Sequence, residues 1–145
     1  MIAVPETLWH ETLRFLRTCG AGRHECVAYW VRSASDTTGI TRTVHPEHHA
    51  TATHYRVDDA WLTRFWIELA RSGESVSVQV HTHGGLAGHS HTDDEGALVY
   101  QPGFLSLVLP GFAMKDDCRD GAFLAELDQA GRWVEVPIDE RLQWI

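Results

Sequence analysis

Two histidines separated by a single residue are the strongest candidates for chemistry in this sequence. His81 and His83 follow a strand pattern in which Val76, Val78 and Val80 alternate with polar residues. Because residues two apart on a strand point to the same face, we expect both imidazoles at one end of that strand. Two convergent imidazoles are half of a metal site.

Asp93 completes the expected ligand set. Zinc in a hydrolytic site takes three protein ligands and keeps its fourth position for water. The loop 84–92 leads from His83 to Asp93 at the start of a predicted helix, where the carboxylate can reach the same ion. The spacing therefore predicts a metal ion held by His81, His83 and Asp93.

Glu25 and Ser90 are the candidate catalytic residues. A metal ion makes water nucleophilic near neutral pH, and a base then has to carry the water proton to the leaving group. Glu25 opens the apolar strand pattern 25–32, where partial burial raises the pKa of a carboxyl group toward the working pH. Ser90, shortly before Asp93, can donate a hydrogen bond to the oxygen that gains charge when a carbonyl is attacked.

Each candidate also has a purely structural interpretation. Histidine-rich tracts are only compositional hints of metal. Asp93 can act as a favourable charge in the first turn of a helix, worth about 0.3–1 kcal/mol. An acid at a strand end, such as Glu25, is commonly just solvated, and Ser90 can be a turn or capping residue.

The other histidines form weaker candidate sets. His89 and His91 can pair with Asp94, but a glycine-flanked loop does not fix their geometry as a strand end does. Five further histidines have no spacing that forces them together, and we interpret them as surface or substrate-facing loop residues: His24, His45, His48, His49 and His54.

Composition and charge exclude several functional classes. The chain has 145 residues, 12 Lys and Arg, and 20 Asp and Glu, giving a net charge of −8. This balance argues against a basic face that grips nucleic-acid phosphates or an anionic membrane. Apolar runs are far shorter than the ~20 residues of a membrane helix, and the N-terminus has acids where a secretory signal has basic residues. We expect a cytoplasmic protein without nucleic-acid or membrane partners.

The three cysteines show no pattern of their own. Cys19, Cys26 and Cys118 include no C-x-x-C pair, which argues against a disulfide framework and against a thiolate zinc knuckle. We therefore expect all three to be reduced, buried thiols.

The elements that must position the site follow from periodicity and capping signals. Helices are predicted at 5–17 and from Asp58 or Asp59 to Gly73, and a capping box at 92–95 predicts a short helix to Tyr100. A loop is predicted at 45–53, and strands are predicted at 25–32, 40–44, 76–83, 104–110, 123–127 and 132–136. No repeat or linker interrupts this order, so we expect a single α/β domain over residues 1–145.

The order of these motifs resembles the JAMM motif of the JAB/MPN metalloprotease family. Glu25, then His81-x-His83, then Ser90-x-x-Asp93 match its order and its strand, loop and helix context. The string QVHTHGGLAGHSHTDD looks like bacterial JAB-domain proteins, and the resemblance extends weakly from Glu25 to about residue 112.

The resemblance implies a fold and an activity. The fold would be a three-layer α/β domain, related to the cytidine-deaminase-like architecture, with a curved mixed sheet flanked by helices. One Zn²⁺ per chain would be held by His81, His83 and Asp93, with Glu25 as general base and acid and Ser90 stabilising the tetrahedral intermediate. The family typically hydrolyses the peptide or isopeptide bond after the C-terminal glycine of ubiquitin or a ubiquitin-like protein.

The same resemblance suggests the partner. The expected partner is the C-terminal tail of a ubiquitin-like protein and its conjugates, with the tail added along a sheet edge such as 40–44. The short stand-alone form resembles deconjugating enzymes of bacterial ubiquitin-like operons, some of which act in phage defence. Trimming of a sulfur-carrier protein and a catalytically silent MPN scaffold are the alternatives. A metal phosphoesterase or amidohydrolase fits less well, because those enzymes need a larger barrel with further ligands.

Two departures from the family pattern concern the ligand loop. Gly84 stands where many relatives have proline, and the interval to Asp93 is one residue shorter than usual. The usual interval selects Asp94, but the serine position would then fall on His91. The serine spacing therefore favours Asp93. The chain also lacks the insertion that sets chain-linkage preference in eukaryotic relatives.

Overall fold

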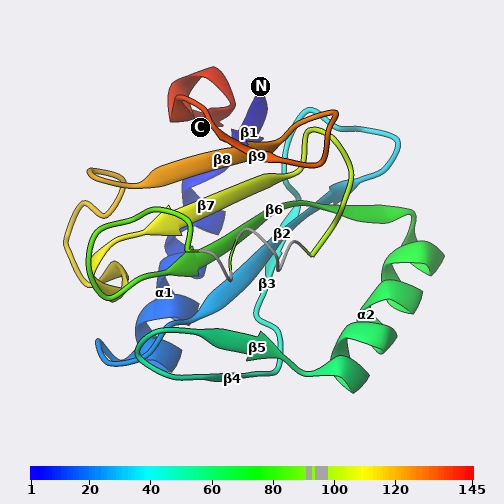
Figure 1. Ribbon diagram of the computed structural model, residues 1–145. Coiled ribbons are helices and arrows are strands. Elements are labelled where there is room, and N and C mark those ends of the chain that lie inside the picture. Colours follow the sequence, from blue (N-terminus) through cyan, green and yellow to red (C-terminus); the bar gives the residue numbers. More distant parts are fainter. Residues whose placement is uncertain (91–92, 94–97) are drawn as a thin grey trace.

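The computed structural model describes residues 1–90, 93 and 98–145, and a mixed six-stranded sheet forms the centre of this part of the chain (Figure 1). Only β6 and β7 run parallel within that sheet, and its other neighbouring strands are antiparallel. In spatial order the strands are β3 (Arg42–Val44), β2 (Val27–Ser33), β6 (Glu74–Thr82), β7 (Leu105–Leu109), β8 (Phe123–Leu127) and β9 (Trp133–Glu135).

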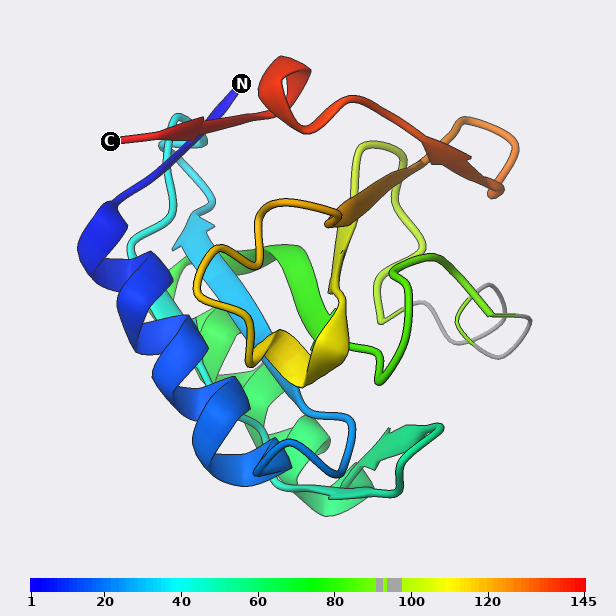
Figure 2. The ribbon, with the colours of Figure 1, turned by 90° about the vertical axis from the view of Figure 1, so that its left-hand side faces the viewer.

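One long helix covers each face of the sheet. Alternate residues of β2 point in opposite directions: Trp30 packs in the cluster that contains Leu16 of α1 (Glu6–Gly20), and Tyr29 packs with Phe65 of α2 (Asp59–Ser72). Figure 2 shows α1 running along one side of the sheet. The predicted α/β class, a mixed sheet flanked by helices, is confirmed.

The ends of α2 follow their predicted signals. The side chain of Asp58 accepts a hydrogen bond from the backbone N–H of Trp61, which caps the first turn. Gly73 ends the helix in the left-handed conformation, with its N–H bonded to the carbonyl of Leu69. The predicted first helix is likewise confirmed, although it continues to Gly20.

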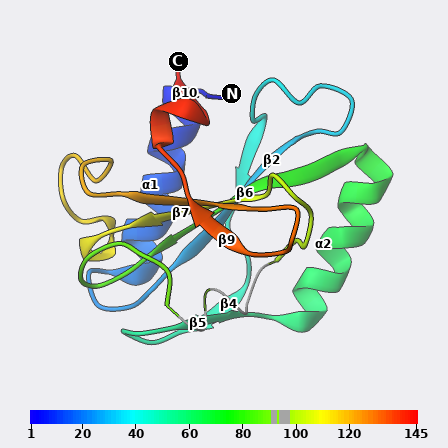
Figure 3. The same cartoon turned by 45° about the horizontal axis from the view of Figure 1, so that its top comes forward.

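The remaining elements lie at the two ends of the sheet. Near the termini, β1 (Ile2–Val4) pairs in parallel with β10 (Leu142–Trp144). At the opposite end, β4 (His48–Ala50) and β5 (Tyr55–Val57) form a separate hairpin (Figure 3). Two short 3-10 helices complete the described elements: Gly111–Ala113 and Ile138–Glu140.

Two predictions differ from the structure. The segment 45–53, predicted as a loop, contains β4, because its backbone pairs with β5 rather than burying an apolar face. Cys19 and Cys26, predicted as reduced thiols, are joined as a disulfide because tertiary contacts bring them together, whereas Cys118 is free and buried as expected. The predicted helix after residue 92 lies largely outside the described residues.

The other predicted strands are found. The segment 40–44 contains β3, which pairs antiparallel with β2 and forms one edge of the sheet. The predicted closing hairpin is formed by β8 and β9. Among the described residues, no helix has the length and apolar character needed to cross a membrane.

Candidate metal centre

His81, His83 and Asp93 meet at the end of β6. His81 is completely buried in the strand and His83 follows directly after it. The two oxygens of Asp93 each face one imidazole, with Oδ2 3.0 Å from Nε2 of His83 and Oδ1 3.4 Å from Nε2 of His81. The structure therefore brings the three predicted ligands together.

The surroundings of His81 fit a metal ligand. Within the part of the chain that the structure describes, neither ring nitrogen of His81 has a hydrogen-bond partner, although the side chain is fully buried. Leaving such a group unpaired costs about 1–3 kcal/mol. A metal ion between the three side chains would take the Nε2 lone pair and remove part of that cost.

The spacing of the ligand atoms fits as well. A tetrahedral ion with bonds of about 2.0–2.1 Å to nitrogen and oxygen has ligand–ligand edges of about 3.3 Å. The two measured N···O separations, 3.0 and 3.4 Å, bracket that value. All three ligand atoms lie within 4.8 Å of one another.

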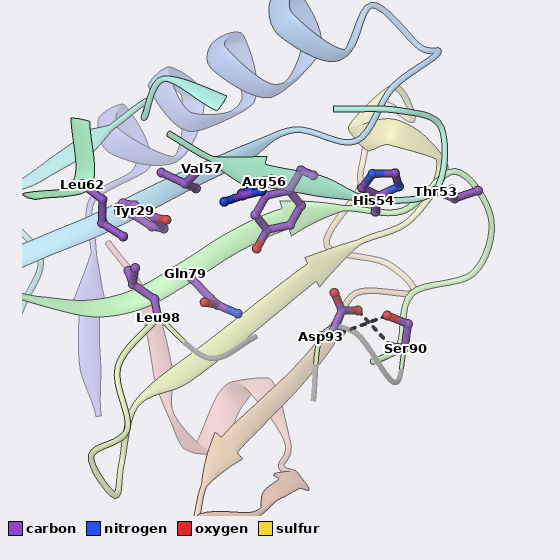
Figure 4. A pocket seen from close by; sticks show the side chains of 11 residues that line it. Tyr29, Thr53, His54, Arg56, Val57, Leu62, Gln79, Ser90, Asp93 and Leu98 are labelled. Atoms are coloured by element: carbon purple, nitrogen blue, oxygen red, sulfur yellow. Dashed lines mark hydrogen bonds between the residues drawn. The ribbon is translucent and has the colours of Figure 1, made fainter. Parts of the chain in front are cut away.

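Ser90 and Asp93 hold each other in place. The backbone N–H of Ser90 donates to Oδ2 of Asp93 at 2.9 Å, and the backbone N–H of Asp93 donates to the Ser90 hydroxyl oxygen at 3.1 Å (Figure 4). This reciprocal pair is the capping role that the sequence left open for Ser90. It also keeps the hydroxyl beside the ligand carboxylate, so both interpretations of Ser90 are compatible with its position.

The charges of the three ligands suit a cation. Burial raises the pKa of Asp93, but the adjacent imidazoles of His81 and His83 outweigh it and hold the pKa far below the usual range. Burial lowers the pKa of His81, so this imidazole is neutral, as a metal ligand must be. The hydrogen bond with Asp93 raises the pKa of His83 in the metal-free protein.

Glu25 lies beside these residues. The antiparallel register pairs Val27 with His81, so Glu25, before β2, comes next to His83, after β6. Its backbone N–H donates to the carbonyl of Thr51 at 2.8 Å, and only 4% of the residue is exposed. Burial raises its pKa to about 7. Such a group exchanges protons near neutral pH, which is what general acid–base catalysis requires.

A cavity of about 320 Å³ leads to this group of residues. Asp93 and Ser90 lie at one end, whereas Leu62 and Leu98 lie at the other (Figure 4). The wall between them is formed largely by residues of β5 and its preceding turn: Thr53, His54, Tyr55, Arg56 and Val57.

Two residues of this region were missed by sequence reasoning. Gln79 lines the cavity and its amide donates to Ser106; the strand period of two that links His81 to His83 could have indicated it. Tyr55 places its ring 5.3 Å from that of His81. No sequence signal indicated Tyr55, because the strand that carries it was not predicted.

The weaker histidine candidates have different positions. His89 contacts the Ser106 hydroxyl at 2.8 Å and packs edge-on against Trp133. His91 and Asp94, its proposed companions, lie outside the described residues. His54 lines the cavity, as expected for a substrate-facing residue, and His24 and His49 are exposed.

The positions of His45 and His48 differ from the prediction. Predicted as surface or substrate-facing residues, they are partly buried because they pack against Cys26 and Cys19. Among the described residues, these four form a second group with ligand atoms close enough for one metal ion.

Steric contact with Phe112 explains why position 84 is a glycine. A side chain at this position would place its Cβ 2.6 Å from the ring of Phe112, closer than carbon atoms can approach. Phe112 is held there because its backbone N–H donates to the carbonyl of His83 at 2.8 Å. The absence of a side chain at Gly84 therefore lets the ring close over the loop that follows the ligands.

Together, the mixed sheet with a helix on each face and the His81, His83 and Asp93 group define an α/β protein with a candidate metal-binding centre. No family model matches the chain. A protein of Sinorhizobium fredii (strain NBRC 101917 / NGR234), named "Probable metalloprotease y4jG", is 33% identical over 147 residues. The match covers 94% of this chain and 87% of that protein. The chain belongs to the family of this probable metalloprotease, which implies a bound metal ion.

Solved structures support the fold alone. The solution structure of protein DSY2949 from Desulfitobacterium hafniense matches with a TM-score of 0.71 at 15% identity, over 100% of this chain and 93% of that one. A solution structure from Salinibacter ruber (strain DSM 13855) matches with a TM-score of 0.57 at 18% identity, over 94% and 89%.

Proposed function

We propose that this protein is a zinc peptidase of the JAB/MPN type that cleaves after the C-terminal glycine of a ubiquitin-like protein. One observation carries the proposal: Glu25, a buried carboxyl group, lies beside His83 and Asp93, which share a candidate metal site with His81. The metalloprotease relative supports peptidase chemistry in general. The narrower assignment rests on the JAMM-like order of these residues.

His81, His83 and Asp93 would hold the zinc ion. When bound, zinc supplies a Lewis acid that polarises the scissile carbonyl and lowers the pKa of water. Asp93 is the anionic ligand and offsets part of the charge of the ion.

Glu25 moves the proton. Its carboxylate accepts a proton from the attacking water and then delivers it to the leaving amine nitrogen, which cannot depart as an anion. Burial keeps the pKa of Glu25 near neutrality, so both transfers can take place at the same pH.

Ser90 stabilises the carbonyl oxygen as it gains charge. Its hydroxyl oxygen accepts a hydrogen bond from the Asp93 backbone, so the hydroxyl proton can be donated to that oxygen. Because Ser90 lines the cavity that reaches Asp93, this donor faces the space where a substrate carbonyl has to lie.

The cavity indicates how an extended tail would bind. In the described residues, β5 pairs only with β4, and β5 lines the cavity leading to Asp93. An extended peptide added along β5 would direct its C-terminal end toward the ligands. We propose this strand as the docking edge in place of β3, because β3 does not line that cavity.

The proposal is tested with the zinc-loaded protein on a randomised peptide library and on ubiquitin aminocoumarin. We expect cleavage after glycine, identified by mass spectrometry, and none by Glu25→Gln at equal zinc content. Cleavage without preference for glycine would support peptidase activity but exclude a ubiquitin-like substrate. Comparing a linear fusion with a lysine-linked conjugate then separates precursor trimming, as for a sulfur-carrier protein, from deconjugation.

A further inference from the structure

A second group of metal-binding side chains lies away from the centre described above. It consists of Cys19, Cys26, His45 and His48, here called the cysteine–histidine cluster, whose ligand atoms all lie within 4.8 Å of one another. The four residues come from the last turn of α1, the residue before β2, the residue after β3 and the start of β4. They converge only in the folded chain.

The sulfur–nitrogen distances match a tetrahedral ion. Sγ of Cys26 lies 3.4 Å from Nε2 of His45, and Sγ of Cys19 lies 3.7 Å from Nε2 of His48. With zinc bonds of about 2.3 Å to sulfur and about 2.0 Å to nitrogen, a tetrahedron has S···N edges of about 3.5 Å. Each sulfur is thus paired with one imidazole at the separation that a shared ion requires.

The imidazoles are oriented as metal ligands are. Nδ1 of His48 lies 2.9 Å from the carbonyl oxygen of Pro46, so Nδ1 carries the proton and Nε2 presents its lone pair to Cys19. His45 is held by stacking on Phe15, with ring centroids 5.3 Å apart.

A disulfide leaves this arrangement unexplained. The bonded sulfur of Cys19 carries no proton that His48 could accept, so the Nε2 lone pair of His48 would face sulfur without a hydrogen bond. The Cα atoms lie 6.3 Å apart, a separation that suits a disulfide and also two neighbouring ligands of one ion.

We propose that the cysteine–histidine cluster binds Zn²⁺ through two thiolates and two imidazoles when Cys19 and Cys26 are reduced. Binding displaces both thiol protons into solvent, and the neutral imidazoles bind through Nε2. Two sulfur and two nitrogen donors are a ligand set that selects zinc in a tetrahedral site. With four protein ligands the site is closed, so its role is structural.

The position of the cluster shows what the ion would fix. Cys26 directly follows Glu25, and its backbone N–H and C=O are bonded to Thr82, which lies between His81 and His83. His48 opens the hairpin that walls the cavity. The ion would therefore anchor both Glu25 and the hairpin to the end of β6. The binding of this ion does not depend on the proposed peptidase activity.

Metal content of the full chain is the first test. The protein is purified without chelators in a phosphine, which reduces a disulfide to two thiols and is itself oxidised, and is then reconstituted with zinc. We expect about two zinc ions per chain in the wild type and about one in Cys19→Ser/Cys26→Ser. Cys118→Ser removes the buried cysteine outside the cluster and should keep both ions. Equal zinc content in the reduced wild type and the double serine variant would overturn the proposal, whereas loss of the only ion in that variant would support the cluster and count against the other centre.

A second test leaves the cluster intact, so that misfolding of the serine variant cannot mislead. The variant His81→Ala/Asp93→Ala, which lacks the other metal centre, is reduced with the same phosphine and loaded with Co²⁺. We expect one bound Co²⁺ with a thiolate-to-cobalt charge-transfer band, and X-ray absorption of the zinc form showing sulfur at about 2.3 Å and nitrogen at about 2.0 Å. No bound ion, or an ion without sulfur neighbours, would contradict the assignment.

Discussion

Replacing Glu25 with glutamine tests the electrostatics of the site in the metal-free protein. Burial raises the pKa of Glu25 from 4.5 to about 7, so the folded state binds the carboxyl proton more tightly than the unfolded chain does. The stabilisation is complete below about pH 4.5 and is lost as the pH rises through about 7. At 1.36 kcal/mol per pKa unit, the difference corresponds to about 3 kcal/mol.

Glutamine cannot ionise, so Glu25→Gln should remove this loss. We expect the two proteins to have similar free energies of unfolding at about pH 4.5, and the variant to be more stable by up to about 3 kcal/mol near pH 8. Urea unfolding of both chelator-treated proteins across this range measures the difference. Glu47→Gln, which removes an exposed carboxylate, is the matched control and should follow the wild type. Parallel profiles for wild type and Glu25→Gln would refute the buried, protonated carboxyl group.

Three further predictions concern the metal centre and its loop. Asp93→Ala should lose the metal ion and Asp94→Ala should keep it, measured by elemental analysis; the reverse result would move the ligand by one residue. The cleavage rate should rise with pH as Glu25 loses its proton. The midpoint of this rise should lie at or below about pH 7, because the bound cation lowers the pKa of Glu25. A pH–rate profile without this rise would exclude Glu25 as the base. Gly84→Ala should destabilise the fold by about 1–3 kcal/mol, because the new methyl group meets the Phe112 ring. Adding Phe112→Leu to this variant should restore part of the lost stability, measured by thermal unfolding. An unchanged unfolding midpoint for Gly84→Ala would show that the Phe112 ring is not confined.

The elements that could be predicted from the sequence are those with a local pattern of apolar residues or helix caps. The β7 strand is buried in the sheet and consists mainly of aliphatic residues, and the β6 strand shows valines that alternate with polar residues. The α2 helix has Asp58 as its N-cap and Gly73 as its C-cap, and both residue types are preferred at these positions. His81 and His83 could be placed together because the period of a strand fixes their direction.

The parts that were missed have no clear local signal. The β4 and β5 strands are only three residues long, which is too short for a sequence period to stand out, and their mutual pairing makes them strands. The cysteine–histidine cluster is assembled from four segments that no local spacing connects. The roles of the candidate site residues stay predictions, since geometry alone does not show catalysis.

The most direct test of the proposed mechanism is one cleavage measurement on two proteins of equal zinc content. Wild type and Glu25→Gln are incubated with the peptide library, and the new termini are identified by mass spectrometry. We expect the wild type to cut after glycine and the variant to make no cut while retaining its zinc. Equal cleavage by the two proteins, or no cleavage by the zinc-loaded wild type, would contradict a peptidase that uses Glu25 as its base.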